Sequence, residues 1–414
     1  MDQRGKQNIS RACIAIVVGT IMGLVLCETA YRILLYTQAT ERFSPSKSVI
    51  AEAFDRPPFL YDAAFGYSHP ANVSYTRTRL TDGIVTSCET ATTNSSGNVI
   101  APKEPSVAEG TLRIAIFGDS WTDATSGGMA WPDFLRDHLA QRGITAKVEN
   151  YGRGAYGILQ MFDLAGAVVP ATKPDLAIIA FITDDLMRAR TWRTVVYGRD
   201  GPAVVASPDP SPAAPLERQR TTHIVVPEAS SEWCSSMLGT GRQDEVTQRI
   251  QSRYSRAAVK SEITADIFTL RHSYLWPRIW RGDPFRGLLN TYRLPKIQLH
   301  SYGADDEIMN AIAALKASGV PIVLVHFAIY PELRANQEYI VTNDQSRLIQ
   351  SLTDVTGWPI LETLAYAQRP LPDLDTIIES PTDYHPSRIG MDFYGQTVAR
   401  MVLGKLSAGT ARPE

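Results

Sequence analysis

Three residues have the side chains that nucleophilic acyl transfer needs: Ser120, Asp383 and His385. A serine hydroxyl becomes a good nucleophile when a base takes its proton, and a histidine base needs a partner that fixes its tautomer. Ser120 ends the run Gly118-Asp119-Ser120. In an extended loop, side chains at positions i and i+2 leave the backbone on the same side, so Asp383 can reach one nitrogen of His385. We interpret Ser120 as a candidate nucleophile, His385 as its base and Asp383 as the partner of the base.

Acyl transfer also needs N–H donors for the oxygen that becomes negatively charged. The turn at residues 150–157 contains three glycines, which let a substrate approach the backbone closely. Taken alone, the same residues are typical of a tight turn between a strand and a helix. Because this turn and Ser120 both follow predicted strands, we expect them to lie at the same edge of a sheet.

The remaining histidines have weaker patterns. His326 ends a predicted strand and could line the same edge, but we interpret it as an interior histidine with its polar contacts satisfied. The other histidines have no carboxylate at a sequence spacing that suggests a pair, and we assign them no role. They are His69, His138, His223, His272 and His300.

Strand and helix patterns alternate over two stretches of the chain. Apolar runs predict strands at residues 113–117, 146–149, 176–181, 321–326 and 359–361. Apolar spacings of three and four predict helices at residues 131–142, 158–167, 305–317 and 344–355, and a last helix after Ser387, which can cap it, to about residue 406. Such alternation indicates an α/β fold with a parallel sheet covered by helices on both faces.

The amino terminus has the pattern of a membrane anchor. Arg4, Lys6 and Arg11 precede an apolar run from Ala12 to Cys27, which resumes weakly up to Tyr36. A spanning helix needs roughly 20 residues, and basic residues favour the cytoplasmic side. We expect a single-pass cell-membrane protein whose bulk is extracytoplasmic, either periplasmic or extracellular. A cleaved signal peptide and a lipoprotein signal ending at Cys27 are the alternatives.

These patterns predict five segments. Residues 1–11 form a cytoplasmic end, 12–36 a transmembrane anchor, 37–110 an extracytoplasmic stalk or edge, 111–190 and 301–406 the α/β domain, and 191–300 an insertion over the edge that holds Ser120. In an oxidising compartment Cys88 and Cys234 can form a disulfide, although two unrelated thiols are an equal alternative. The lack of a C-x-x-C pair argues against a zinc site. A formal net charge of −2 gives no reason to expect nucleic acid.

Four segments occur in the order of the signature blocks of the SGNH/GDSL hydrolases, and the chain resembles the membrane-anchored envelope members of that family. They are Gly118-Asp119-Ser120, Asn150–Gly157, Thr183-Asp184-Asp185 and Asp383–Pro386. The likeness covers about residues 112–190 and 308–406. It implies a three-layer α/β/α sandwich with a flavodoxin-like parallel sheet. It also implies oxyanion donors: the N–H of Ser120, the N–H of Gly154 and an asparagine side chain at the position of Asp184.

The chain departs from the family pattern at two positions. One residue, instead of the usual two, separates Asp383 from His385. Asp184 replaces the asparagine, and an ionised aspartate accepts hydrogen bonds but cannot donate them. The alternatives are that Asp184 is turned away, protonated or paired with Arg188, that the third donor comes from elsewhere, or that the enzyme is slow or inactive.

The resemblance and the anchor together predict a membrane-anchored serine esterase. We expect its substrate to be a small acyl ester, acetyl in particular, of an envelope carbohydrate or lipid. This chemistry requires no metal or organic cofactor. The expected partners are this substrate, the membrane and other envelope biosynthesis proteins. The alternatives are an O-acyltransferase that uses the same triad with a partner acyl donor, and a non-catalytic glycan-binding or envelope-assembly protein, which Asp184 favours.

Overall fold

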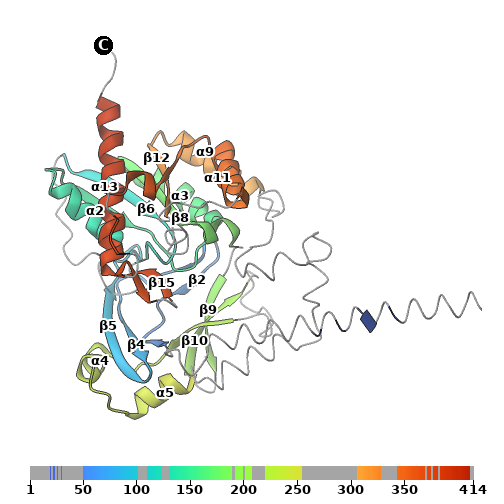
Figure 1. Cartoon of the computed structure of the whole chain (residues 1–414), viewed down its shortest axis with the longest axis vertical. Coiled ribbons are helices and arrows are strands. Elements are labelled where there is room, and N and C mark those ends of the chain that lie inside the picture. The colour runs from blue at the N-terminus through green and yellow to red at the C-terminus, as the bar shows by residue number, and fades with distance from the viewer. Residues whose placement is uncertain are drawn as a thin grey trace, which may run out of the picture. The chain divides into compact units, whose positions relative to one another are not determined.

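The structure is a computed structural model of the 414-residue chain (Figure 1). It describes residues 50–100, 110–123, 130–188, 192–198, 201–207, 220–253, 305–327, 343–368, 371–373, 376–380 and 383–410, together with 19, 22, 23, 26 and 29. The chain divides into two compact units. The first comprises Met1–Ala51, Leu80–Ile84 and Arg242–Leu294 and contains helix α5 (Glu245–Arg253). The second comprises Glu52–Arg79, Val85–Gly241 and Pro295–Glu414.

A five-stranded parallel sheet forms the centre of the second unit. Its strands are β6 (Leu112–Phe117), β7 (Ala146–Asn150), β8 (Leu176–Ile182), β12 (Ile322–Phe327) and β13 (Ile360–Glu362). The spatial order is β7-β6-β8-β12-β13, which reads 2-1-3-4-5 along the chain. This is the flavodoxin-like order, in which ligands bind beyond the carboxyl ends of the first and third strands. The predicted α/β fold and parallel sheet are therefore confirmed.

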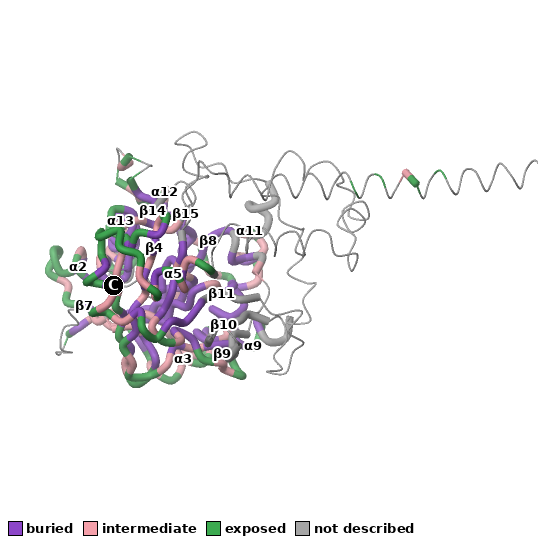
Figure 2. Tube along the Cα trace, turned by 90° about the horizontal axis from the view of Figure 1, so that it is seen from below, coloured by how far each residue is buried: buried purple, intermediate pink, exposed green. Residues whose placement is uncertain are grey.

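Helices cover both faces of this sheet (Figure 1). Alternate residues of β6 show why: Ala115 and Phe117 face one cluster of buried side chains, and Ile114 and Ile116 face another. The first cluster includes residues of α3 (Ile158–Thr172), α9 (Asp305–Ala317) and α11 (Asn343–Thr356). The second includes residues of α2 (Trp131–Ala140) and α13 (Arg388–Thr410). Figure 2 shows the buried positions concentrated in the sheet between these layers.

Helix α13 positions the carboxyl-terminal part of the site. The hydroxyl of Ser387 accepts a hydrogen bond from the N–H of Gly390 at 3.2 Å, so the predicted cap is present. A Cβ added to Gly395 would lie 2.5 Å from Cβ of Phe134, which shows how closely α13 packs on α2. This close packing holds the segment before Ser387 against the sheet.

A second sheet joins the predicted stalk to the predicted insertion. Its order is β5-β4-β1-β11-β10-β9, and it consists of β1 (Ile50–Phe54), β4 (Ser74–Thr81), β5 (Ile84–Thr92), β9 (Trp192–Gly198), β10 (Gly201–Ser207) and β11 (Arg220–Val225). Strand β1 pairs with β11 in parallel, and β10 pairs antiparallel with both β11 and β9. Residues 50–92 thus contribute the strands β1, β4 and β5 to this sheet.

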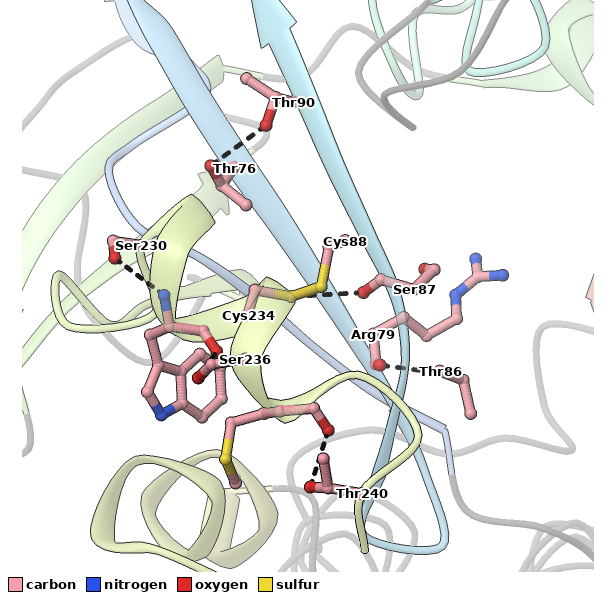
Figure 3. Close-up of a disulfide and its surroundings, with 12 residues drawn as sticks. Thr76, Arg79, Thr86, Ser87, Cys88, Thr90, Ser230, Cys234, Ser236 and Thr240 are labelled. Carbon is pink, nitrogen blue, oxygen red and sulfur yellow. Dashed lines mark hydrogen bonds between the residues drawn. A yellow bond between two sulfur atoms is a disulfide. The ribbon is translucent and has the colours of Figure 1, made fainter. Parts of the chain in front are cut away.

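Cys88 and Cys234 form a disulfide (Figure 3), which decides between the two alternatives that the sequence left open. The bond links β5 to α4 (Ser231–Met237) across 146 positions of sequence. No helix in the described part of the chain has the length and hydropathy of a membrane span. Nearly all of residues 12–36 fall outside that part, so the anchor stays a prediction.

Candidate active site

Ser120 lies in a tight turn at the carboxyl end of β6. The N–H groups of Thr122 and Asp123 donate to the carbonyl oxygen of Asp119 at 3.1 and 2.8 Å. A Cβ on Gly118 would lie only 2.1 Å from Oγ1 of Thr122, so the turn needs glycine there. Ser120 itself is half-buried, and its hydroxyl stands at the sheet edge where this fold binds ligands.

His385 approaches Ser120 from the opposite end of the domain sequence. It lies on β15 (Asp383–Pro386), which pairs antiparallel with β14 (Ile378–Ser380). Its Nε2 lies 2.9 Å from Oγ of Ser120, across 265 positions of sequence. The structure therefore brings the predicted nucleophile and base within hydrogen-bond distance. Asp383 begins the same strand, but its side chain lies outside the described residues, so its role stays a prediction.

Arg188 connects two buried carboxylates behind Ser120. Its Nη1 lies 3.2 Å from Oδ2 of Asp119 and 2.6 Å from Oδ1 of Asp185, and it donates to the carbonyl oxygen of Tyr156 at 3.3 Å. The hydroxyl of Ser120 lies 3.5 Å from the same Oδ2 of Asp119. One guanidinium thus ties together the three loops that follow β6, β7 and β8.

Asp184 belongs to the short 3-10 helix η2 (Thr183–Met187) that follows β8. Its neighbour Asp185 points inward, where Oδ2 accepts a hydrogen bond from the N–H of Ile182 at 2.9 Å. The side chain of Asp184 lies outside the described residues. Arg188, which we considered as a partner for Asp184, binds Asp119 and Asp185. The part that Asp184 takes in oxyanion binding stays a prediction.

The glycine turn lies beside Ser120, as predicted. A Cβ on Gly154 would lie 3.8 Å from Cβ of Ser120. The N–H of Gly154, however, donates to Oδ2 of Asp123 at 2.7 Å, so this predicted oxyanion donor already has an acceptor. The hydroxyl of Tyr67 donates to the carbonyl oxygen of Gly154 at 2.6 Å. Hydrogen bonds therefore hold the peptide groups on both sides of Gly154.

The partner of His69 could not be predicted from the spacing of residues in the sequence. His69 follows β3 (Gly66–Ser68), and its Nε2 lies 3.2 Å from Oδ1 of Asp123, across 54 positions of sequence. Burial would raise the pKa of Asp123, but the charges of His69 and Arg153 and the hydrogen bonds from His69 and Gly154 hold that pKa below its ordinary value. Only the three-dimensional structure shows this pair, because neither residue belongs to a periodic or motif-like pattern.

His326 is an interior histidine, as we interpreted it. It is fully buried on β12, with Nδ1 2.7 Å from Oε2 of Glu362 and Nε2 3.0 Å from Oγ1 of Thr183. The carboxylate comes from β13 and the hydroxyl from the residue after β8. This second centre has a carboxylate, an imidazole and a hydroxyl in series. Neither at this centre nor elsewhere in the described residues do three His, Cys, Asp or Glu side chains converge as metal ligands would.

Comparisons with known proteins found similar solved structures and one matching family model. Solved structures similar to the chain include a lipase/acylhydrolase from Enterococcus faecalis, with 13% identity and a TM-score of 0.32, covering 71% of this chain and 97% of that one. Another is a family 3 carbohydrate esterase from Clostridium thermocellum, with 12% identity and a TM-score of 0.33, covering 72% and 98%. A third is a catalytic mutant of an acetylxylan esterase from Geobacillus stearothermophilus, with 12% identity and a TM-score of 0.33, covering 72% and 96%.

No curated protein sequence matches the chain. Residues 114–218, about a quarter of the chain, match the sequence model of a family described as GDSL-like lipase/acylhydrolase. The matched segment contains Ser120, Gly154 and Asp184 and ends before His385. Over these residues the chain is similar to the GDSL-like lipase/acylhydrolase family.

Proposed function

We propose that this protein is a serine esterase that removes a small acyl group, of which acetyl is the leading candidate, from an envelope carbohydrate or lipid. The observation that carries the proposal is the 2.9 Å approach of His385 Nε2 to Ser120 Oγ. The two groups meet at the carboxyl edge of a 2-1-3-4-5 parallel sheet, and both are half-buried, so an ester can reach them.

Catalysis begins at Ser120. Its Oγ bonds to the ester carbonyl carbon while its proton passes to Nε2 of His385. The carbon–oxygen bond to the alcohol then breaks, and His385 returns the proton to the departing alkoxide. Water repeats the sequence on the acyl-enzyme, with His385 again taking and returning one proton, and releases the carboxylic acid. Asp383 holds the tautomer of His385 in which Nε2 accepts the serine proton.

The oxyanion forms on the carbonyl oxygen and needs donors near Ser120. The N–H of Ser120 is one proposed donor. Gly154 stands beside the serine, but Asp123 holds its N–H, so that N–H must share its proton between two acceptors to contribute. Asp184 supplies no donor when ionised. We therefore expect a moderate catalyst rather than an efficient one.

Two features support an anchored, extracytoplasmic location. The basic and apolar pattern of the amino terminus favours a retained anchor at residues 12–36. The disulfide between Cys88 and Cys234 is of a kind that persists in oxidising compartments. Carbonate washing of membranes tests this location, because an anchored chain stays with the pellet. Release into the supernatant, or an amino terminus shortened by cleavage, would contradict the retained anchor.

The esterase is tested with the full-length chain in detergent, using 4-nitrophenyl acetate. The Ser120→Ala variant should lose at least about 10⁴-fold in kcat, because alanine has no hydroxyl group with which to form the acyl-enzyme. Ser236→Ala is the matched control, since this exposed serine lies on α4 and donates to the carbonyl oxygen of Trp233. Equal rates for the wild type and Ser120→Ala would refute the proposal.

Two further readouts separate the remaining alternatives. A fluorophosphonate probe should label Ser120, and a chain that stays unlabelled fits the non-catalytic glycan-binding or assembly protein that Asp184 favours. An O-acyltransferase would be labelled too. It would differ by passing the acyl group to a sugar hydroxyl in preference to water, which product analysis with an added oligosaccharide detects.

A further inference from the structure

Gly154 is held in place by a chain of buried contacts that starts in the segment before β6. A Cβ on Gly154 would lie 3.3 Å from Oδ2 of Asp123 and 3.8 Å from Cβ of Ser120, so carboxylate and serine flank the same glycine. Asp123 accepts the N–H of Gly154, and Tyr67 donates to its carbonyl oxygen. The hydroxyl of Tyr156 in turn donates to the carbonyl oxygen of Tyr67 at 2.6 Å.

His69 faces an acceptor at each ring nitrogen. Nδ1 lies 2.7 Å from the carbonyl oxygen of Pro58, which can only accept, so this nitrogen carries a proton. Nε2 faces the carboxylate of Asp123 at 3.2 Å. An ionised Asp123 therefore requires a proton on Nε2 as well, and an imidazolium satisfies both contacts. Phe59 stacks on the ring with centroids 4.9 Å apart, and both side chains are buried.

The position of Asp123 makes its charge relevant to catalysis. A buried carboxylate on the far side of Gly154 repels an oxyanion that forms at Ser120. His69 contacts this carboxylate directly, and Arg153, which donates to the carbonyl oxygen of Gly152 and to Asn98, adds a second positive charge nearby. Loss of the positive charge that contacts this carboxylate, several ångströms from the oxyanion and at an effective dielectric constant of about 20, lowers a rate by about 10- to 100-fold.

We propose that His69 is a positioning residue of the active site: as an imidazolium it neutralises Asp123 and fixes the Asp123–Gly154 contact beside Ser120. This inference rests on the proposed esterase function. It also assigns a task to the segment around β3, which precedes the residues matched by the family model. This segment supplies His69, whose positive charge offsets the negative charge of Asp123 next to the oxyanion site.

Three variants of the full-length chain test the charge, with kcat and KM measured on 4-nitrophenyl acetate. His69→Gln leaves Asp123 ionised and should lower kcat about 10- to 100-fold with little change in KM. Asp123→Asn removes the charge and still accepts the Gly154 N–H, so its loss should be smaller. The double variant His69→Gln/Asp123→Asn should recover most of the loss of His69→Gln, because glutamine and asparagine can satisfy each other without charge.

His138→Gln is the matched control. Its Nε2 lies 2.7 Å from Oδ1 of Asp392, between α2 and α13, and kcat should stay at the wild-type value. A wild-type kcat in His69→Gln would overturn the proposal. So would a double variant that is no better than His69→Gln, since a packing defect would not be relieved by a second change. Thermal unfolding of each variant confirms that the chain is folded.

Nitrogen NMR of selectively labelled histidine tests the pair without reference to activity. His69 should show protons on both ring nitrogens at pH 7, assigned by the loss of its signals in His69→Gln. A ring with one proton would overturn the imidazolium. If the wild type hydrolyses no ester and Ser120→Ala behaves identically, the esterase proposal fails, while the NMR result still decides the state of His69.

Discussion

Two histidines at the carboxyl edge of the parallel sheet each place Nε2 against a hydroxyl. His385 lies 2.9 Å from Oγ of Ser120, and His326 lies 3.0 Å from Oγ1 of Thr183. At the buried centre the histidine also contacts a carboxylate, because Nδ1 of His326 lies 2.7 Å from Oε2 of Glu362. Judged by these hydrogen-bond distances alone, His326 has the geometry of a catalytic histidine.

Access to solvent separates the two centres. His326 and Thr183 are 0% and 1% exposed, whereas Ser120 and His385 are half-buried. An ester cannot reach a hydroxyl enclosed between strands β8, β12 and β13. Buried polar groups need partners, and a carboxylate, imidazole and hydroxyl in series satisfy one another. The same arrangement therefore serves stability in one place and suits chemistry in the other.

The largest expected effect comes from removing the exposed base. His385→Gln should lower kcat on 4-nitrophenyl acetate by at least about 10⁴-fold, because a glutamine amide cannot take the proton of Ser120. The free energy of unfolding should change little, since the side chain is partly exposed. Steady-state kinetics and urea unfolding measure the two quantities. A loss below tenfold would mean that another group activates Ser120.

A substitution of Asp184 should give the next largest change in kcat. Asp184→Asn restores the amide that the family pattern places at this position, and an oxyanion donor is worth about 10²–10³ in rate. We expect kcat to rise by about 10- to 100-fold. Asp175→Asn, at the opposite end of β8, is the matched control, because its Oδ2 accepts the N–H of Arg113 and asparagine can do the same. An unchanged kcat in Asp184→Asn would show that Asp184 is turned away from the site.

Periodic elements and motifs were predictable from the sequence. Alternating apolar residues predicted all five parallel strands, and the Ser387 cap and the meeting of Ser120 with His385 followed from local motifs. Helical spacing placed the flanking helices within a few residues of their ends. These features depend on near neighbours or on a fold whose strand ends meet at one edge, so a single sequence carries enough information for them.

Long-range polar contacts were not predictable. Asp123 and His69, and Arg188 with Asp119, pair across loops that have no hydrophobic period. The second sheet was missed for a related reason: its strands come from two segments separated by the α/β core, and β1 pairs in parallel with the distant β11. Pairing partners of this kind are chosen by packing in the folded state, which leaves no pattern in either segment alone.

Removing the buried base should affect stability more than activity. His326→Gln loses the fit to Glu362 and Thr183 in a closed site, and we expect the free energy of unfolding to fall by about 1–3 kcal/mol. The kcat should stay within about fivefold of the wild type, measured after correcting for the folded fraction. A kcat loss comparable to that of His385→Gln would show that the buried centre takes part in the chemistry and would remove the distinction drawn from exposure.

The smallest effect should come from the buried hydroxyl. Thr183→Val deletes one hydroxyl group with little change of shape, and the lost hydrogen bond to His326 should cost about 1 kcal/mol of unfolding free energy. The kcat should stay within about twofold. Ser120→Ala deletes the same kind of group at nearly the same distance from an imidazole nitrogen. The ratio of the kcat loss in Ser120→Ala to that in Thr183→Val therefore measures how much access to substrate contributes to catalysis when the hydrogen-bond distance is nearly the same. A ratio near one would show that exposure to solvent does not distinguish the two centres.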